Sequence, residues 1–224
     1  MSLVDDGAIF LDLSGNAYLG IDAATRDALR TSLVGLDESA DRSTKSSTAD
    51  LPIALAALVR RGLITDSASL GRPFSRPCVR LTHALPFGTG RRETRISMAQ
   101  AMRFVIALTR ASIMIRRGQL SRLTAHVRAL KARLSTSGIT EAQDVVALVH
   151  VVRRLSVLCY TPKNACLLDS AILAELLIEQ GHAVTLVFGV RTKPFLAHAW
   201  VQMDTCVLND SLEHAQTLTP ILAI

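Results

Sequence analysis

Cys166 opens an otherwise aliphatic segment, TPKNACLLDSAILAELLIEQGH over residues 161–182. Pro162 and Asn164 before the segment and Gly181 near its end are helix start and stop signals, which would place the cysteine about two residues past an Asn N-cap. Unpaired backbone N–H groups and the positive end of the helix dipole stabilise a thiolate at such a place. Since the thiolate is the nucleophilic form, the position suggests covalent catalysis, although a lone cysteine there is more often a small core residue.

A base and a carboxylate follow the cysteine in the chain. His198 lies in AHAWVQM and Asp210 in CVLND, two segments that are typical of the strands of an antiparallel hairpin. Because side chains alternate along a strand, Asp210 would share its face with Cys206, whereas Asn209 would point to the opposite face. If the helix start packs over these strands, the nucleophile Cys166 meets a base and an orienting carboxylate. The backbone N–H of the cysteine is then the natural oxyanion donor.

The other histidines and cysteines have no comparable context. The four cysteines form no CxxC pair and no zinc-ligand spacing, so we expect neither a metal site nor a disulfide framework. We assign no chemistry to five histidines, namely His83, His126, His150, His182 and His214. We interpret three cysteines and the tryptophan as packing residues, namely Cys78, Cys159, Cys206 and Trp200.

The chain is predicted to be of the α+β class. Residues 8–21 alternate as a hairpin around the turn SGN, and Asp22 could cap the helix that follows. Helices are predicted over residues 23–33, 51–61, 97–117, 120–134 and 140–155, before the Cys166 helix. The run AVTLVFGV predicts a buried strand ahead of the last hairpin. We expect a small domain over residues 1–70, a linker over 71–90 that is rich in Pro and Gly, and a second domain over 91–224.

Composition argues against a membrane protein. The chain is 49% hydrophobic, yet no uncharged apolar run approaches the ~20 residues that cross a bilayer. The most apolar stretch, MAQAMRFVIALTRASIMIRR, contains Arg103 and Arg110, and we interpret it as an amphipathic helix. The N-terminus MSLVDDGAIF is acidic, unlike a signal peptide. We therefore expect a cytoplasmic protein without membrane contact.

The charge is divided unevenly along the chain. Residues 1–70 hold ten acidic and six basic residues, a net charge of −4, whereas residues 91–133 hold ten Arg and Lys131 against Glu93, a net charge of +10. Such a contrast suggests two units with different tasks. The arginines lack interleaved aromatic residues and a nucleic-acid motif, so we interpret them as a solvated helix face and, second, as a docking face for an acidic partner. A nucleic-acid binder is the least favoured class.

The segments CLLDSAILAELLIEQGH, LVFGV, PFLAHAWVQ and VLND resemble the lasso peptide maturation B proteins, leader peptidases with a transglutaminase-like cysteine-protease domain. The spacing of 32 residues from Cys166 to His198 and of 12 from His198 to Asp210 matches that family's pattern. The resemblance implies a papain-like domain of helices and antiparallel sheet, in which these residues form a Cys-His-Asp triad.

Residues 1–70 resemble a second element, the PqqD-like module that recognises leader peptides of ribosomally made peptides. The segment IFLDLSGNAYLGID resembles its hairpin and LAALVRRGLI its last helix, which implies a winged-helix-like domain. An edge strand of the hairpin would then bind the leader by β-augmentation, beside an apolar groove. The candidate binding residues are Tyr18, Leu19, Ile21, Leu55, Leu58 and Val59.

Together the two resemblances imply a peptidase that binds a lasso precursor and removes its leader. They also imply a partner, an asparagine-synthetase-like cyclase that uses ATP; this chain has no P-loop, since GTGRRE lacks the required Lys and Ser/Thr pair, so we expect no cofactor in it. Two alternatives stay open. The same triad serves acyl transfer in arylamine N-acetyltransferases, and a non-catalytic scaffold could deliver the precursor to another enzyme.

Overall fold

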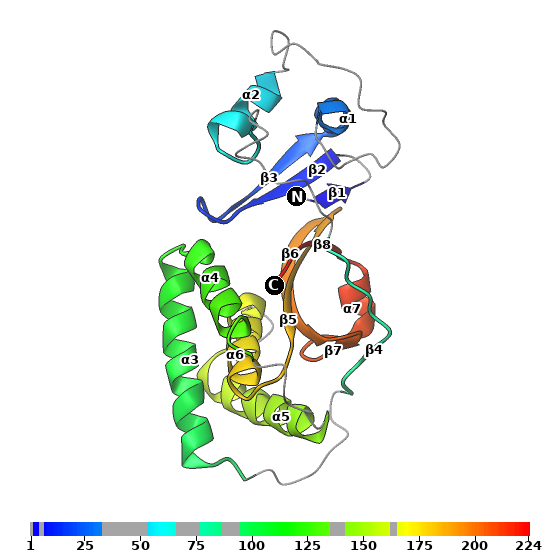
Figure 1. Ribbon diagram of the computed structural model, residues 1–224. Coiled ribbons are helices and arrows are strands. Elements are labelled where there is room, and N and C mark those ends of the chain that lie inside the picture. Colours follow the sequence, from blue (N-terminus) through cyan, green and yellow to red (C-terminus); the bar gives the residue numbers. More distant parts are fainter. Residues whose placement is uncertain are drawn as a thin grey trace. The chain divides into compact units, whose positions relative to one another are not determined.

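The computed structural model describes residues 2–4, 7–32, 53–65, 77–86, 95–134, 142–161 and 165–224 (Figure 1). The chain folds into two compact units. The first comprises residues 1–12 and 17–77, and the second comprises residues 13–16 and 78–224. The two units are described separately below.

The first unit is a small antiparallel sheet with two helices. Its strands lie in the order β1-β2-β3, and the tight turn at residues 13–16 connects the last two. The strands are β1 (Ser2–Val4), β2 (Gly7–Asp12) and β3 (Ala17–Asp22), and the helices are α1 (Ala23–Ser32) and α2 (Ile53–Arg60). Asp22 accepts a hydrogen bond of 2.8 Å from the backbone N–H of Thr25, so it caps α1 as predicted.

Residues of β2, α1 and α2 build the core of the first unit. Its hydrophobic cluster contains four buried side chains, namely Ala8, Phe10, Leu29 and Leu58. Four more are partly buried against them, namely Leu19, Ile21, Leu63 and Ile64. The predicted hairpin and the two helices are thus present. The winged-helix-like, PqqD-like architecture stays a prediction.

The second unit contains four long helices on one side of a sheet (Figure 1). They are α3 (Met98–Arg116), α4 (Leu120–Lys131), α5 (Ala142–Cys159) and α6 (Cys166–Glu179). Ser97 and Gln100 form a reciprocal capping box that fixes the start of α3. Helix α6 packs against the other three helices and against the sheet, and every residue from Asp169 to Ile178 is buried. A helix that is apolar nearly all round is central, which explains its composition.

The sheet of the second unit has the strand order β4-β7-β6-β5-β8. Its strands are β4 (His83–Ala84), β5 (Thr185–Thr192), β6 (Phe195–Met203), β7 (Cys206–Val207) and β8 (Thr219–Ala223). The pairs among β5 to β8 are antiparallel, and β4 runs parallel to β7. The short helix α7 (Leu212–Gln216) covers the face opposite the long helices (Figure 1).

Part of the segment predicted as a linker belongs to this sheet. Within the predicted linker, residues 71–90, strand β4 pairs with β7, and the backbone N–H of Leu85 donates to Val207 O at 2.8 Å. The chain divides between Pro77 and Cys78 instead. Pro and Gly residues mark irregular backbone, but they do not distinguish a free linker from a chain that lies along a sheet edge.

Trp200 fills the core beneath the sheet, as expected for a packing residue. Its side chain is completely buried with Val187 and Leu218, and an added Cβ at Gly189 would lie 2.6 Å from the indole ring. Gly189 pairs with His198 across β5 and β6. The glycine thus allows the indole ring of Trp200 on β6 to pack closely over β5, next to the position that pairs with His198.

A buried ion cluster ties the outer helices to α6. The carboxylate of Glu175 on α6 accepts hydrogen bonds from Arg110 of α3 and His126 of α4, the latter at 3.2 Å. Burial raises the pKa of this carboxyl, and Arg110 and His126 act against that rise. His126, to which we assign no chemistry, thus has a structural contact. Arg110 is likewise not part of a merely solvated face.

By length and composition alone, α3 is the one helix in the described part of the chain that could cross a membrane. Three of its side chains, Phe104, Ala107 and Ala111, are buried in the unit, and the helix packs against α4, α5 and α6. Its opposite side is exposed and partly apolar, with Met98, Met102, Val105, Ile106 and Ile113. This helix thus has apolar residues on both its inner and its outer side.

Candidate active site

Cys166 is the first residue of α6, and the helix start differs from the prediction. The N-cap is Ala165, whose side chain cannot cap, rather than Asn164, which lies outside the described residues. The backbone N–H of Asp169 donates to Ala165 O at 2.9 Å as the first intrahelical bond. The N–H groups of Cys166 and the two residues after it therefore have no intrahelical acceptor. The half-buried thiol lies at this electropositive end.

His198 lies on β6, and Asp210 lies in the bend between β7 and α7. The imidazole Nε2 is 2.7 Å from Asp210 Oδ2. The predicted strand CVLND was wrong in its second half, because β7 ends at Val207 and strand alternation does not reach Asp210. The carboxylate instead precedes the N-cap of α7, Ser211, whose backbone N–H donates to Oδ1 at 2.8 Å.

The Cys166 thiol and His198 lie close enough to shift each other's pKa, and Nε2 of His198 is hydrogen-bonded to Asp210, so the three side chains lie together. Burial raises the pKa of the thiol, but the hydrogen bond to His198, the backbone N–H of Ala199, the imidazole charge and the N–H of Leu167 together outweigh it. The net effect lowers the pKa of Cys166 below its ordinary value. This favours the thiolate form that nucleophilic catalysis needs.

The pKa of the His198 imidazole is raised, whereas the pKa of the Asp210 carboxyl is lowered. Burial lowers the pKa of His198, whereas its hydrogen bonds to Asp210 and Cys166 and the charges of both residues raise it to about 9. For Asp210, burial raises the pKa, and the hydrogen bonds from His198 and Ser211 with the nearby imidazole charges bring it below its ordinary value. These directions favour a thiolate, an imidazolium and a carboxylate over the three neutral groups.

His214 is a fourth member of this cluster that sequence reasoning missed. Its Nδ1 lies 2.9 Å from Oδ2 of Asp210, and its ring centroid is 4.6 Å from that of His198. From the sequence we assign no chemistry to His214 and do not predict this contact with Asp210. The i, i+4 spacing to Asp210 was the available signal, but it becomes meaningful only if the two residues flank a helix start.

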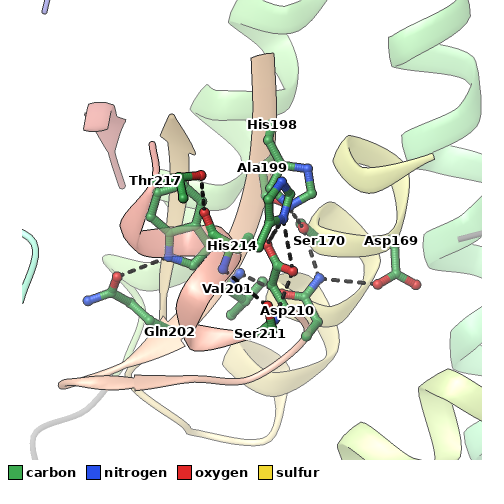
Figure 2. A network of polar contacts seen from close by, with 12 residues as sticks. Asp169, Ser170, His198, Ala199, Val201, Gln202, Asp210, Ser211, His214 and Thr217 are labelled. Carbon is green, nitrogen blue, oxygen red and sulfur yellow. Dashed lines mark hydrogen bonds and ion pairs between the residues drawn. The ribbon is translucent and has the colours of Figure 1, made fainter. Parts of the chain in front are cut away.

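Asn209 braces the site through hydrogen bonds to three residues beside it, Val201, Asp169 and Ser170, which are labelled in Figure 2. Its Oδ1 accepts the backbone N–H of Val201 on β6 at 2.8 Å, and its Nδ2 donates to Asp169 at 3.1 Å and to Ser170 at 2.9 Å on α6. One side chain therefore joins the bend, the strand of the histidine and the helix of the cysteine. The alternative that Asn209 itself orients His198 does not hold in this geometry.

Two further polar residues complete the brace within the first turns of α6. The hydroxyl of Ser170 donates to Ala199 O at 2.9 Å. The carboxylate of Asp169 accepts hydrogen bonds from the hydroxyls of Ser156 on α5 at 3.1 Å and of Tyr160, directly after α5, at 3.0 Å. Satisfied polar networks of this kind fix a single arrangement, because a shifted helix would leave buried groups without partners.

The cluster also has the donor types of a transition-metal site. One ligand atom each from His198, Asp210 and His214 lies within 4.8 Å of the others. Imidazole nitrogen and carboxylate oxygen suit zinc and its neighbours. The same atoms, however, already form the hydrogen bonds described above, and these account for their closeness without an ion. The cysteines outside the site, Cys78, Cys159 and Cys206, are free thiols.

The candidate binding residues of the first unit differ in how far their side chains are exposed to solvent. Leu58 is only 4% exposed and belongs to the core, so its side chain does not line a surface groove. Leu19 and Ile21 are partly buried against that core, and Tyr18 and Val59 are partly exposed. Among the described strands, β3 pairs on one side only, with β2. For the sixth candidate, Leu55, the backbone is described as part of α2, but the side chain is not.

Comparisons with known proteins address the second unit. Residues 105–223 match the Transglutaminase-like superfamily. Neither a curated protein nor a solved structure matches the chain. The matched residues make up more than half of the 224-residue chain and include Cys166, His198 and Asp210. On this match and on the mixed helix-and-sheet fold, the chain belongs to the transglutaminase-like superfamily, which includes cysteine peptidases and acyltransferases.

Proposed function

We propose that the protein is a cytoplasmic cysteine peptidase that binds a lasso peptide precursor and cleaves off its leader. The observation that carries the proposal is that the Cys166 thiol, at the N-terminus of a buried helix, interacts with His198, whose Nε2 lies 2.7 Å from Asp210 Oδ2. The superfamily supports cysteine chemistry in general. The leader of a lasso precursor, as the specific substrate, comes from the resemblance of the motifs around these three residues.

The geometry supports a two-step reaction through an acyl-enzyme. The thiolate of Cys166 attacks the carbonyl carbon of the scissile peptide bond, and the backbone N–H of the same residue is positioned to stabilise the oxyanion. The imidazolium of His198 donates its proton to the leaving amine as the C–N bond breaks. His198 then takes a proton from water, which attacks the thioester and releases the acyl fragment and the thiolate.

Asp210 has a supporting part in this reaction. It accepts the Nε2–H of His198, which leaves Nδ1 of the ring for the sulfur of Cys166. The carboxylate also stabilises the imidazolium by its negative charge. Removal of the charge by Asp210→Asn should therefore slow acylation while Cys166 stays in place.

In this proposal the first unit holds the leader peptide. The support is the open side of β3 among the described strands, next to the partly exposed side chains of Tyr18 and Val59. An extended leader would add a strand there and place its apolar side chains beside α2. Such recognition suits a short, disordered leader that orders on binding.

A partner cyclase of the asparagine-synthetase type, which would use ATP, is part of the same proposal. The support for such a partner is the charge of α3 and α4, because residues 95–134 contain nine Arg and Lys residues and no Asp or Glu. The exposed side of α3 is apolar at Met102, Val105 and Ile106. An acidic protein with an apolar groove would complement this surface, so we place the docking face here.

The test is to incubate the purified full-length chain with candidate precursor peptides, with and without a cyclase and ATP, and to detect the fragments by mass. We expect cleavage into leader and core, and loss of cleavage in Cys166→Ala and His198→Ala. Cys206→Ala is the matched control, since it removes another partly buried thiol of the same unit. Normal cleavage by Cys166→Ala would refute the proposal.

The alternative function within the superfamily is acyl transfer of the arylamine N-acetyltransferase type, because the same three residues, Cys166, His198 and Asp210, would serve it. A thioester donor and an amine acceptor in place of the precursor distinguish the two. Transfer to the amine without peptide cleavage would favour the acyltransferase. A protein that stays fully functional after alkylation of Cys166 would favour a non-catalytic scaffold.

A further inference from the structure

His214 contacts the carboxylate of Asp210 beside His198. Its Nδ1 lies 2.9 Å from Oδ2 and 3.2 Å from Oδ1. The same Oδ2 is 2.7 Å from Nε2 of His198, and the planes of the two rings are tilted by 59°. One carboxylate oxygen thus receives two imidazoles that come from different elements, β6 and α7.

The position of His214 is itself fixed by local structure. Its backbone N–H donates to the hydroxyl of Ser211 at 3.1 Å, which caps the start of α7. On the other side of the helix, Ala215 is buried in the core under the sheet. The first turn of α7 is therefore held by this core and by the contact of His214 with Asp210.

A carboxylate needs such partners because its last torsion is broad. The terminal sp³–sp² torsion of Asp has no sharp preference, so hydrogen bonds determine which oxygen faces His198. The N–H of Ser211 holds Oδ1, and the imidazole of His214 holds the carboxylate at Oδ2. With His214 removed, only His198 itself would hold that oxygen in the described part of the chain.

We propose that His214 is a positioning residue that holds the Asp210 carboxylate in the orientation required by His198, and thereby maintains the reactive thiolate of Cys166. The inference rests on the proposed function of these three residues. It assigns no contact with substrate to His214. The imidazole acts through Asp210 alone.

The charged and titratable groups around the cluster are few. His214 faces Asp210 and His198, and the other ionisable side chain of its own helix, Glu213, is exposed. His198 faces Asp210 and Cys166. Among the described residues, removal of His214 can therefore change the pH dependence of the Cys166 thiol only through Asp210 and His198.

The experiment measures the rate of iodoacetamide alkylation of Cys166 against pH in the full-length chain, with mass detection at the peptide level because other thiols are exposed. In His214→Ala and His214→Leu we expect the midpoint to rise by about 0.5 to 1 pH unit, so that the rate at pH values below the wild-type midpoint falls roughly three- to tenfold. The plateau at high pH should not change, because every thiol is then ionised. His214→Asn, which keeps an N–H donor near Nδ1, should restore most of the midpoint.

Glu213→Gln is the control for general damage to α7, and its profile should superimpose on that of the wild type. Superimposed profiles for wild type and both His214 variants would overturn the proposal. So would a loss by the same factor at every pH, since that indicates a structural effect without a shift of the thiol. If the wild-type thiol itself titrates in the ordinary range, the proposed function fails, and the His214 inference fails with it. A low wild-type midpoint unaffected by the His214 variants refutes the inference alone.

Discussion

The two units of the chain are held in different ways. In the second unit, polar side chains such as Asn209, Asp169 and Ser170 join three elements at the candidate site with hydrogen bonds of 2.8 to 3.1 Å. In the first unit, the described core is an apolar cluster, with Phe10 and Leu29 among its buried members. Directional bonds fix atoms to within a fraction of an ångström, whereas apolar packing defines a surface.

The contrast suggests a division of labour. Covalent chemistry needs groups in fixed positions, because a small displacement of a nucleophile is costly in rate. Recognition of an extended peptide needs an open strand edge and an apolar surface, which tolerate variation. In our proposal the second unit therefore cuts the precursor and the first unit binds it. The predictions below separate the two tasks.

The largest effect is expected from the nucleophile. Cys166→Ala should lower the cleavage rate by a factor of at least about 10⁴, since loss of a nucleophile removes the whole covalent route. Affinity for the precursor, measured by fluorescence anisotropy, should stay within about twofold if binding lies in the first unit. A large loss of affinity in this variant would break the division between the units.

The reverse experiment changes the first unit. Val59→Asp places a charge on the partly exposed face of α2, and Tyr18→Ala removes an aromatic side chain from β3. We expect the double variant Tyr18→Ala/Val59→Asp to bind the precursor roughly ten- to hundredfold more weakly, as is found for anchor residues of interfaces. Alkylation of Cys166 should proceed at the wild-type rate. Arg60→Ala, an exposed neighbour on α2, is the control, and unchanged affinity in the pair would argue against this binding surface.

The third prediction concerns the polar brace. Asn209→Ala removes three hydrogen bonds and leaves the N–H of Val201 without its acceptor. We expect kcat to fall about tenfold and the free energy of unfolding to fall by about 2 kcal/mol, measured by steady-state kinetics and by urea denaturation. Gln216→Ala, at an exposed position on α7, should change neither. An unaltered kcat would mean that the brace serves stability only.

The fourth prediction tests the packing beneath His198. Gly189→Ala would put a Cβ 2.6 Å from the Trp200 ring and 3.0 Å from Leu218, so something must shift. We expect a loss of about 1 to 3 kcal/mol in the free energy of unfolding, as for an overpacked core. Because Gly189 pairs with His198 across the two strands, the substitution should also displace His198 and lower kcat. Equal stability of the variant and the wild type would contradict the tight packing.

The smallest effect is the pH dependence of the wild-type enzyme. The ion pair exists above the lowered pKa of Cys166 and below the raised pKa of His198, at about 9. Cleavage should therefore be steady across neutral pH, with half of the rate lost at about pH 9 as the imidazolium loses its proton. A rate that keeps rising beyond this pH would show that an ordinary thiol is the reactive form.

Much of the fold could be predicted from sequence because its signals are local. Apolar periodicity and Ser97 indicated α3 to within a residue or two, and the β-branched run before Gly189 indicated β5. The elements that were missed, β1, β4, β8 and α7, are short. Elements of this length carry little periodic signal, and tertiary contacts decide whether they form.

The candidate site was predictable in its residue types but not in its construction. Spacing and chemistry pointed to Cys166, His198 and Asp210, although the carboxylate was expected on a strand and lies in a bend. The roles of Asn209 and His214 depend on how the bend folds back on α6 and α7. No local pattern encodes such long-range hydrogen bonds, so only the structure reveals them.

The most direct test of the central claim is the ionisation of Cys166 itself, followed by the ultraviolet absorbance of the thiolate during a pH titration. Subtraction of the Cys166→Ala curve removes the contribution of the three other free thiols. The account predicts one thiolate already present at neutral pH, which disappears from wild type when His198 is replaced by Ala. A difference curve that titrates like an ordinary cysteine, with or without His198, would contradict it.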